Sequence, residues 1–566
     1  MSKQLPDAEP EVLESNDDVY SGGSVLLHST KLEVDISIEE VCRILVSSNM
    51  FTLGLLGDSS LYYKAGGALK KDRLKIEQTI AGYGLTVDGL DGFRDADTSD
   101  SYAWSLNMAL NLLLSEKKFF NSEFGFPAES ARLFLRPICI RVEGVEEYEI
   151  LIPILKYSSG GIISLSLYDL LGFTDSSLTD VVRREVNKSQ LNVVSVLCEK
   201  DFHLACAECQ ISEMPLKERL SKRNAIKRMI ASALSESEVV PFADEQLELY
   251  ELLHGISQMT LTDVARNLLS VVARAVDQGR VITDVNWYGR QSSNRSIGKY
   301  WHSKPIVNIH THTSQADSSI VNAKVHQRLI DSVLTRIPLR DGDSYSVHSP
   351  KDMRGYDDFN NFYSESVSLL LASAKVVPAL EKIGGYDFEN MISDMYVLNE
   401  AALYISIYYS YASIALSSCD NAVDVIEVEL DVLRFEESLA AIYKFGEVVN
   451  YFGEVRRGSH FDSVYKGYQK KIEVVRKAIE LSESKAENSY NRHLTIIFGI
   501  IASATLSPEL IMPLARIYRV SSGDDSVDKV LAIILSMLLV FAVVMLIGLF
   551  FRVANYSRRR MFLARR

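Results

Sequence analysis

The segment from Asn286 to Lys304 places aromatic and basic side chains side by side in a chain that is otherwise acidic. Aromatic faces stack on nucleobases, and guanidinium groups bind phosphate oxygens. We therefore interpret the segment as a candidate site for a nucleotide or another phosphorylated ligand. The alternative is a long loop that packs on the protein body or contacts another subunit. The residues of this candidate site are Trp287, Arg290, Arg295, Lys299 and Trp301.

A second group of residues has the types that bind zinc, in the stretch CEKDFHLACAEC. Cys206 and Cys209 have CxxC spacing, and Cys198 and His203 could complete a Cys₃His set. The distant second pair of ligands that such sites usually have is missing. The surrounding alanine and leucine favour a buried element in which cysteine acts as a small hydrophobic residue, so we favour core packing over zinc.

A third pattern is the apolar stretch PIVNIHTH, which ends in His310 and His312. Alternate residues of a strand point to one face, and this pattern is similar to the metal-binding start of amidohydrolases. The chain then becomes helical, and only His326 and His348 remain nearby, so a polar strand end is the favoured interpretation. Because P-loop, GxSxG, HExxH and kinase motifs are also missing, the sequence predicts no enzyme, with a metal-dependent hydrolase as the distant alternative.

Composition limits the classes to which the chain can belong. Its 566 residues include 47% hydrophobic and 24% charged residues, as in folded globular proteins. The formal net charge of −14 argues against general nucleic-acid binding, which needs a basic surface. Six cysteines fit a reducing compartment. Residues 1–23 are acidic, lack an apolar core and predict a disordered tail.

Two apolar segments near the C-terminus predict a transmembrane hairpin. Val530–Phe551 has 22 residues without a charge, enough to span a bilayer. The segment 493–519 is weaker because Ser507-Pro508-Glu509 interrupts it; it either crosses or lies at the interface. The loop 520–529 is acidic, with Asp524, Asp525 and Asp528, and the tail 552–566 is basic. The positive-inside rule then predicts a multi-pass protein of the inner or plasma membrane with both termini in the cytoplasm.

The elements before this hairpin predict an α+β body followed by long stalk helices. Leu133–Asp169 is rich in β-branched residues and predicts a β meander within an α/β domain at 24–210. Residues 211–420 predict a mainly helical domain. Residues 421–492 predict antiparallel stalk helices, the last running from about Ser459 into the membrane. A heptad seam along it, from Phe461 through Tyr468 to Ile479, packs either within the subunit or between subunits.

This order of elements resembles the CorA family of homopentameric divalent-cation channels, whose stalk helices continue into the pore. The resemblance covers the last 150 residues or so and is architectural, because the Gly-Met-Asn signature of the family is absent. It implies a pentameric cation channel or transporter gated by its cytoplasmic body, with a divalent cation such as Mg²⁺ as the transported or regulatory ion. Glu509, Ser503, Thr505 and Ser507 would line the ion path. The alternatives are that Glu509 pairs at the headgroup level, and that the protein is a non-conducting, membrane-tethered sensor or effector that binds a nucleotide or a protein partner.

Overall fold

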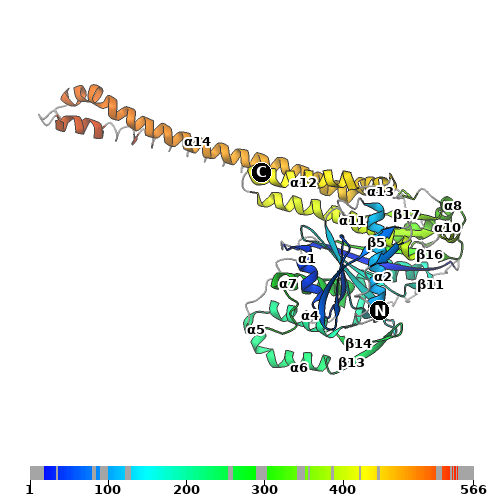
Figure 1. Cartoon of the computed structure of the whole chain (residues 1–566). Coiled ribbons are helices and arrows are strands. Elements are labelled where there is room, and N and C mark those ends of the chain that lie inside the picture. The colour runs from blue at the N-terminus through cyan, green and yellow to red at the C-terminus, as the bar shows by residue number, and fades with distance from the viewer. Residues whose placement is uncertain are drawn as a thin grey trace, which may run out of the picture. The chain divides into compact units, whose positions relative to one another are not determined.

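The computed structural model (Figure 1) describes most of the chain. The described residues are 18–32, 36–78, 85–88, 100–120, 129–252, 259–288, 302–340, 351–354, 357–383, 388–419, 422–442, 446–517, 526–535, 538, 541–542 and 545. They divide into two compact units. The first contains Met1–Ser418 and Ile426–Lys471, and the second contains Cys419–Val425 and Ile472–Arg566.

A large mixed sheet of 16 strands forms the centre of the first unit. Its main path runs β13-β14-β12-β8-β9-β10-β1-β16-β18-β17. These strands are β13 (Ser237–Phe242), β14 (Glu245–Glu251), β12 (Asn192–Cys198), β8 (Ile138–Val142), β9 (Glu149–Ser158), β10 (Ile162–Asp169), β1 (Val19–Lys31), β16 (His302–His312), β18 (Ser368–Ala372) and β17 (Phe359–Tyr363). The pairs are antiparallel except β16 with β18, which are parallel. The sheet therefore joins segments that the sequence had assigned to two domains.

Six further strands lie off this path, and two more form a small separate sheet. The six strands are β2 (Phe51–Leu56), β3 (Ser60–Ala65), β4 (Ala68–Arg73), β7 (Ser130–Leu135), β11 (Phe173–Ser177) and β15 (Met259–Thr260). The separate pair is β5 (Lys75–Gln78) and β6 (Leu85–Asp88). The predicted β meander is confirmed as β7–β10, in which β9 pairs antiparallel with β7, β8 and β10.

Helices pack on both faces of the sheet. The helices of the first unit are α1 (Ile38–Val46), α2 (Asp100–Phe119), α3 (Leu178–Asp180), α4 (Lys200–Glu213), α5 (Leu216–Ser221), α6 (Arg223–Ala233), α7 (Leu261–Gln278), α8 (Ser319–Val325), α9 (Gln327–Thr335), α10 (Val376–Ile383), α11 (Phe388–Ala415) and α13 (Gly446–Arg457), with the short turns η2 (Val181–Val186), η3 (Lys188–Gln190) and η4 (Leu416–Ser418). The apolar side chains of α1, α4 and α7 share one core with alternate residues of the strands, such as Leu133, Leu155 and Leu165. The residues between them point to the opposite face, toward α2 and α11.

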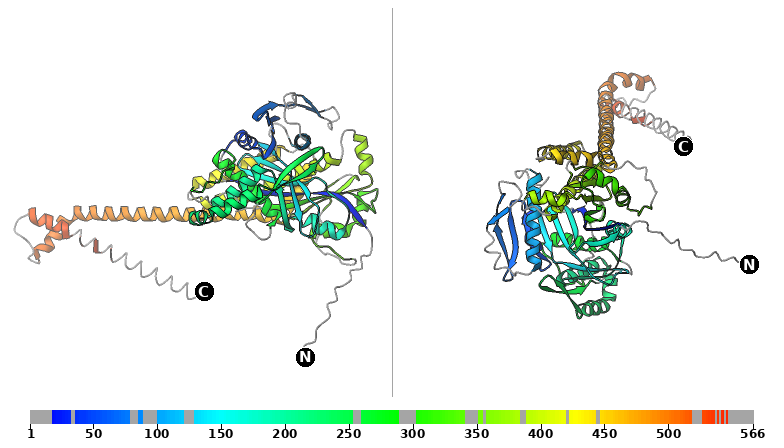
Figure 2. Two further views of the ribbon diagram at one scale, coloured as in Figure 1. Left: turned by 90° about the horizontal axis from the view of Figure 1, so that it is seen from below. Right: turned by 90° about the vertical axis from the view of Figure 1, so that its right-hand side faces the viewer.

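The long helix predicted to begin at Ser459 is confirmed. It is α14 (Ser459–Ile517), a helix of 59 residues, and its long stretch is seen in the left view of Figure 2. It follows α12 (Ala422–Ile442) and α13. Phe461 and Tyr468 of its heptad seam are buried, and both rings meet Tyr409 of α11, at 5.4 and 6.2 Å between centroids. This part of the seam therefore packs within the chain.

The predicted transmembrane hairpin is wrong. In the part of the chain that the structure describes, which includes 446–517 and 526–535, no helix has the length and apolar character needed to cross a bilayer. The uninterrupted apolar run of α14, Leu494–Leu506, is about 20 Å long at 1.5 Å per residue, against a hydrocarbon layer of about 30 Å. The placement in the inner or plasma membrane, with two crossings and cytoplasmic termini, and the interpretation as an ion-transport protein are corrected with it.

One buried histidine makes the stability of the fold depend on pH. His28 of β1 is completely buried, and its pKa is lowered to about 3 by burial and by the nearby charge of Arg266. The folded state holds the neutral ring while the unfolded chain takes up a proton below about pH 6.5, so this stabilisation is present above pH 6.5 and is lost as pH falls. We expect the free energy of unfolding to fall by about 2 kcal/mol from this group between pH 7.5 and pH 5.

Urea denaturation at both pH values measures this effect. His28→Gln should show a shallower pH dependence than the parent, whereas His493→Gln, at an exposed position of α14, should keep the parent slope. Equal slopes for the parent and His28→Gln would contradict the assignment to His28.

Candidate aromatic–basic surface

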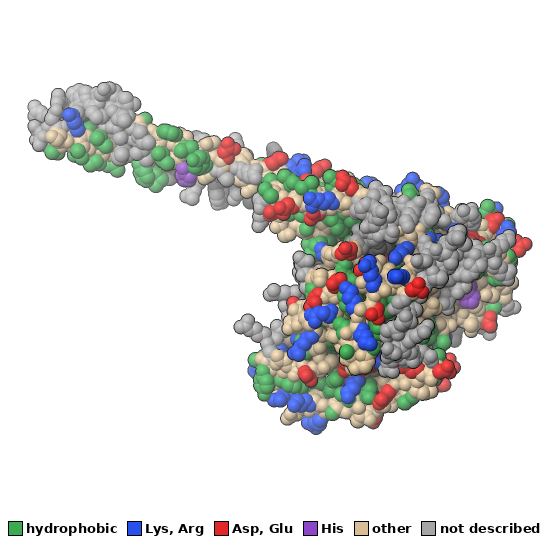
Figure 3. All heavy atoms as spheres, viewed as in Figure 1, with side chains coloured by type: hydrophobic (Ala, Val, Ile, Leu, Met, Phe, Trp, Pro, Cys, Tyr) green, Lys and Arg blue, Asp and Glu red, His purple; other side chains and the backbone are tan. Residues whose placement is uncertain are grey.

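Helices α5 and α6 present a strongly basic surface on an acidic protein. Between Leu216 and Ile230 the sequence has six Lys or Arg residues and one acidic residue, Glu218. Pro215 is the N-cap residue that directly precedes α5, where the missing N–H of proline costs no helical hydrogen bond. None of the residues of α6 is buried. The basic side chains of these helices gather at the lower edge of the space-filling view (Figure 3).

One arginine of this segment is structural and fixes the turn that carries the aromatic residues. Arg219 is fully buried, and its guanidinium donates to the carbonyl oxygens of Ser212, Met214 and Asn286 at 3.2, 3.1 and 2.9 Å. The side chain of Asn286 in turn accepts a hydrogen bond from the backbone N–H of Tyr288 at 3.3 Å. The turn at Asn286–Tyr288 is therefore held against the start of α5.

A second arginine lies close to both rings of this turn. The Cζ atom of Arg223 is 5.7 Å from the ring centroid of Trp287 and 5.4 Å from that of Tyr288. Its Nη1 donates to the Tyr288 hydroxyl at 2.8 Å. Lys227, one helical turn further along α6, places Nζ 5.9 Å from the Trp287 centroid. These are cation–π distances, and Tyr288 is nevertheless 69% exposed.

Exposed cations adjoin this pair of rings. Lys227 and Arg228 of α6 are exposed, and Lys222 is exposed with its ammonium 2.6 Å from Glu218. Rings that already lie in fixed positions can stack on a flat ligand at low conformational cost. The neighbouring cations can bind anionic groups of the same ligand. We define Arg223, Lys227, Trp287 and Tyr288 as the aromatic–basic surface.

The sequence found part of this surface. Trp287 belongs to it, whereas the other predicted members, Arg290, Arg295, Lys299 and Trp301, lie outside the described residues. Sequence analysis missed Arg223 and Lys227, which precede the turn by about 60 residues. The run KERLSKRNAIKR was the available signal, because its positive charge is unusual in a chain of net charge −14.

The predicted zinc ligands lie in the protein core. Cys198 ends β12, and His203, Cys206 and Cys209 belong to α4. Burial raises the pKa of each of the three thiols, which favours the protonated form over the thiolate that binds zinc. The Nδ1 of His203 lies 2.8 Å from the carbonyl oxygen of Glu251. Across the described ranges, no three His, Cys, Asp or Glu side chains are grouped so that they could hold a metal ion.

The predicted pore residues do not form a described site. Ser503, Thr505, Ser507 and Glu509 lie on the helical backbone of α14, and their side chains are outside the described residues. Asp524 and Asp525 are also outside them, and Asp528 belongs to the helical residues 526–535. His348 lies in the range 341–350, which is not described either.

A second cluster of charged groups is buried between the sheet and helices α2 and α11. Arg132 Nη2 donates to Glu116 Oε1 and Glu400 Oε2, both at 2.6 Å. Lys156 Nζ lies 2.5 Å from the same atom of Glu116 and 3.4 Å from that of Glu400. Tyr396 completes the cluster, with its hydroxyl 2.5 Å from Ser166 Oγ. Burial opposes the charge of Glu116, but Lys156 and Arg132 outweigh it and lower its pKa.

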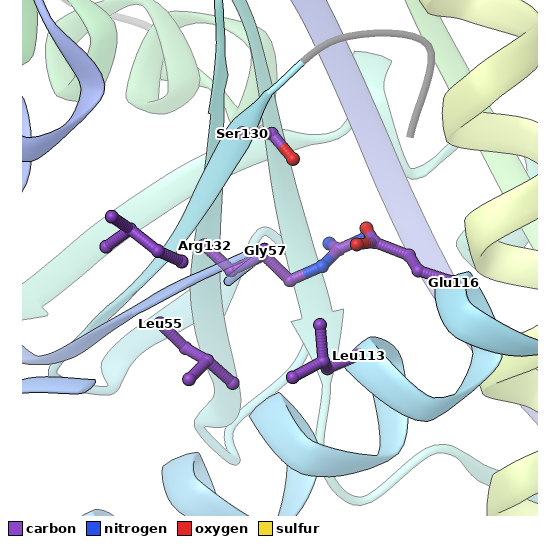
Figure 4. Close-up of a pocket in the computed structure, with 7 residues that line it drawn as sticks. Leu55, Gly57, Leu113, Glu116, Ser130 and Arg132 are labelled. Atoms are coloured by element: carbon purple, nitrogen blue, oxygen red, sulfur yellow. The ribbon is translucent and has the colours of Figure 1, made fainter. Parts of the chain in front are cut away.

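The cavity beside this buried cluster is too small for a ligand. Leu55, Gly57, Leu113 and Ser130 line it with Glu116 and Arg132 (Figure 4). Its volume of about 10 Å³ is close to what one water molecule needs. Two acids and two bases in contact are mutually neutral, so we interpret the cluster as a structural link between the sheet and the helices.

Comparisons with known proteins leave these sites without a precedent. No family model, no curated protein and no solved structure matches the chain. The resemblance to the CorA family therefore stays a prediction from the order of elements, and the function rests on the geometry of the chain itself.

Proposed function

We propose that the protein is a binding protein for a nucleotide, which it recognises on the aromatic–basic surface. The observation that carries the proposal is that the Arg223 guanidinium lies within cation–π distance of both Trp287 and Tyr288. This arrangement holds two aromatic faces at the surface next to cations. A nucleotide combines a flat base with phosphates, and so matches both features.

The surface also has a structural alternative, in which Arg223 only caps the turn at Asn286–Tyr288. The turn does not need Arg223 to hold it in place, because the buried Arg219 already donates a hydrogen bond to the carbonyl oxygen of Asn286. The exposure of Tyr288 and the additional cation of Lys227 favour a ligand. Conduction of ions is not proposed, because it required the membrane hairpin that the described helices contradict.

The test is a binding titration of the full chain with fluorescent ATP and GTP analogues. Trp287→Ala removes one stacking face, and we expect it to weaken binding by roughly fivefold to a hundredfold, since base–aromatic stacking contributes about 1–3 kcal/mol. Lys227→Glu should weaken binding by a similar factor and reduce its salt dependence. Lys70→Glu, at an exposed position of β4, is the charge-matched control and should bind as the parent does.

Competition experiments separate the contribution of the base from the contribution of the phosphates to binding. Unlabelled ATP should displace the probe fully, whereas adenosine and inorganic triphosphate should each displace it only at much higher concentration. Probe binding that survives both Trp287→Ala and Lys227→Glu would place the ligand elsewhere. Binding of neither analogue at millimolar concentration would refute the proposed function.

A further inference from the structure

Two histidines that are distant from the aromatic–basic surface meet inside the first unit. His312 ends β16, and His326 follows the last residue of α8. Their ring centroids are 4.2 Å apart with an interplanar angle of 75°, and the side chains are 6% and 2% exposed. The ring of Tyr20 lies against both, at 6.3 and 6.0 Å. The sequence had pointed to His312 but paired it with His310, whose Nδ1 lies 3.0 Å from the Thr311 hydroxyl instead.

The hydrogen bonds of the two rings define which nitrogens carry protons. His312 Nε2 lies 3.0 Å from the carbonyl oxygen of Ala372, and His326 Nε2 lies 3.1 Å from that of Ser314. A carbonyl oxygen only accepts, so both Nε2 atoms are donors. In the neutral rings, both Nδ1 atoms then bear lone pairs. Both are buried, and neither has a hydrogen-bond partner within the described part of the chain.

Two buried, unpartnered nitrogen lone pairs on adjacent rings are costly. An unsatisfied buried acceptor destabilises the fold, so each of the two lone pairs lacks an electron-pair acceptor. A histidine whose outer N–H donates to a backbone carbonyl is the usual arrangement of a metal ligand, because the hydrogen bond fixes the tautomer and the orientation of the ring. The hydroxyls of Thr313 and Ser314 hydrogen-bond the carboxylate of the nearby Asp18.

We propose that His312 and His326 bind a transition metal ion through their Nδ1 atoms. Imidazole ligands favour ions such as Zn²⁺, Co²⁺, Ni²⁺ and Cu²⁺ over Mg²⁺ and Ca²⁺. Since the described residues place no third His, Cys, Asp or Glu side chain with the pair, the remaining coordination positions belong to water. The site is independent of the nucleotide proposal, and each stands if the other fails.

Cobalt is the probe for the experiment, because Co²⁺ takes the coordination of zinc and absorbs visible light. The full chain is loaded with Co²⁺, freed of unbound metal and measured by elemental analysis and by absorption. We expect about one ion per chain, bands shifted from those of aqueous Co²⁺, and displacement by Zn²⁺ but not by Mg²⁺. Zn²⁺ should also raise the midpoint of thermal unfolding.

The variants identify the ligands. His312→Gln and His326→Gln should lose most of the bound ion. His203→Gln is the matched control, because His203 is also buried with one unpartnered ring nitrogen, and it should keep the ion. If His312→Gln fails to fold, His326→Gln and the cobalt spectrum of the parent protein still test whether the two histidines bind the ion. A parent protein that retains no Co²⁺, or equal loss in His203→Gln and His326→Gln, would overturn the proposal and leave a shared proton or a water between the rings.

Discussion

Replacement of Arg132 by methionine is expected to lower the free energy of unfolding by about 3–5 kcal/mol, the usual cost of removing one partner of a buried ion pair. The change leaves two carboxylates, Glu116 and Glu400, on the face of the sheet that α2 and α11 cover, with only Lys156 to neutralise them. Even when it is charged, Lys156 balances only one of the two carboxylates, so it cannot replace the lost guanidinium. Glu400 is fully buried and cannot turn to water.

The double variant Arg132→Met with Glu400→Leu distinguishes a lost charge balance from lost packing. It removes one cation and one anion together and leaves Lys156 paired with Glu116 at 2.5 Å. We expect it to recover more than half of the loss, because a buried pair replaced by apolar residues of similar size is often neutral. Arg184→Met is the control, since the pair of Arg184 and Asp180 is at 3.9 Å and half exposed; it should change stability by less than about 0.5 kcal/mol.

Urea denaturation of the four proteins gives these differences. An Arg132→Met loss near that of Arg184→Met would mean that the cluster does not link the helices to the sheet. A double variant less stable than Arg132→Met alone would show that the packing of the side chains, and not their charge balance, is what matters.

The sequence predicted the elements whose signals are local. The β-branched segments and turns of Leu133–Asp169 became β7–β10, and the heptad spacing from Phe461 became α14. The single sheet could not be predicted in this way, because β1 pairs with β16, which begins only at His302. The buried cluster of charged groups could not be predicted for the same reason, since Arg132 and Glu400 are 268 residues apart in the sequence. No spacing rule connects such residues.

The predictions that failed or stayed incomplete also have causes in particular residues. The segment Leu494–Ile517 was interpreted as a membrane crossing from its apolar run and from the charges that flank the predicted hairpin. Its uninterrupted run is short, and no described helix is long and apolar enough to span a bilayer. The CxxC of Cys206 and Cys209 is no error of this kind, because core packing was the favoured interpretation and both thiols are buried on α4. The candidate surface was found only through Trp287, since the cations that meet its ring come from another element.

Gly172→Ala is expected to destabilise the fold by about 3 kcal/mol or more, through a collision between backbones. Gly172 follows β10 with φ of +63°, and a Cβ there would lie 2.2 Å from the carbonyl oxygen of Gly22 in β1. Gly22 itself sits at the register shift between β1 and β16, where an added Cβ would meet the carbonyl oxygen of Asn308 at 1.9 Å. Three backbone segments thus approach one another where only glycine fits.

Gly160→Ala separates the collision from the strain of a positive φ. Gly160 has φ of +81° but no atom within 4 Å of its added Cβ, so only the left-handed conformation opposes the substitution, at about 1–2 kcal/mol. Thermal and urea unfolding of both variants measure the difference. If Gly172→Ala is no less stable than Gly160→Ala, the strands move apart at little cost and the close approach does not hold the register. A larger loss of stability for Gly172→Ala would show that this close approach helps to fix β1 between β10 and β16. It would then also help to fix the position of His312 at the end of β16.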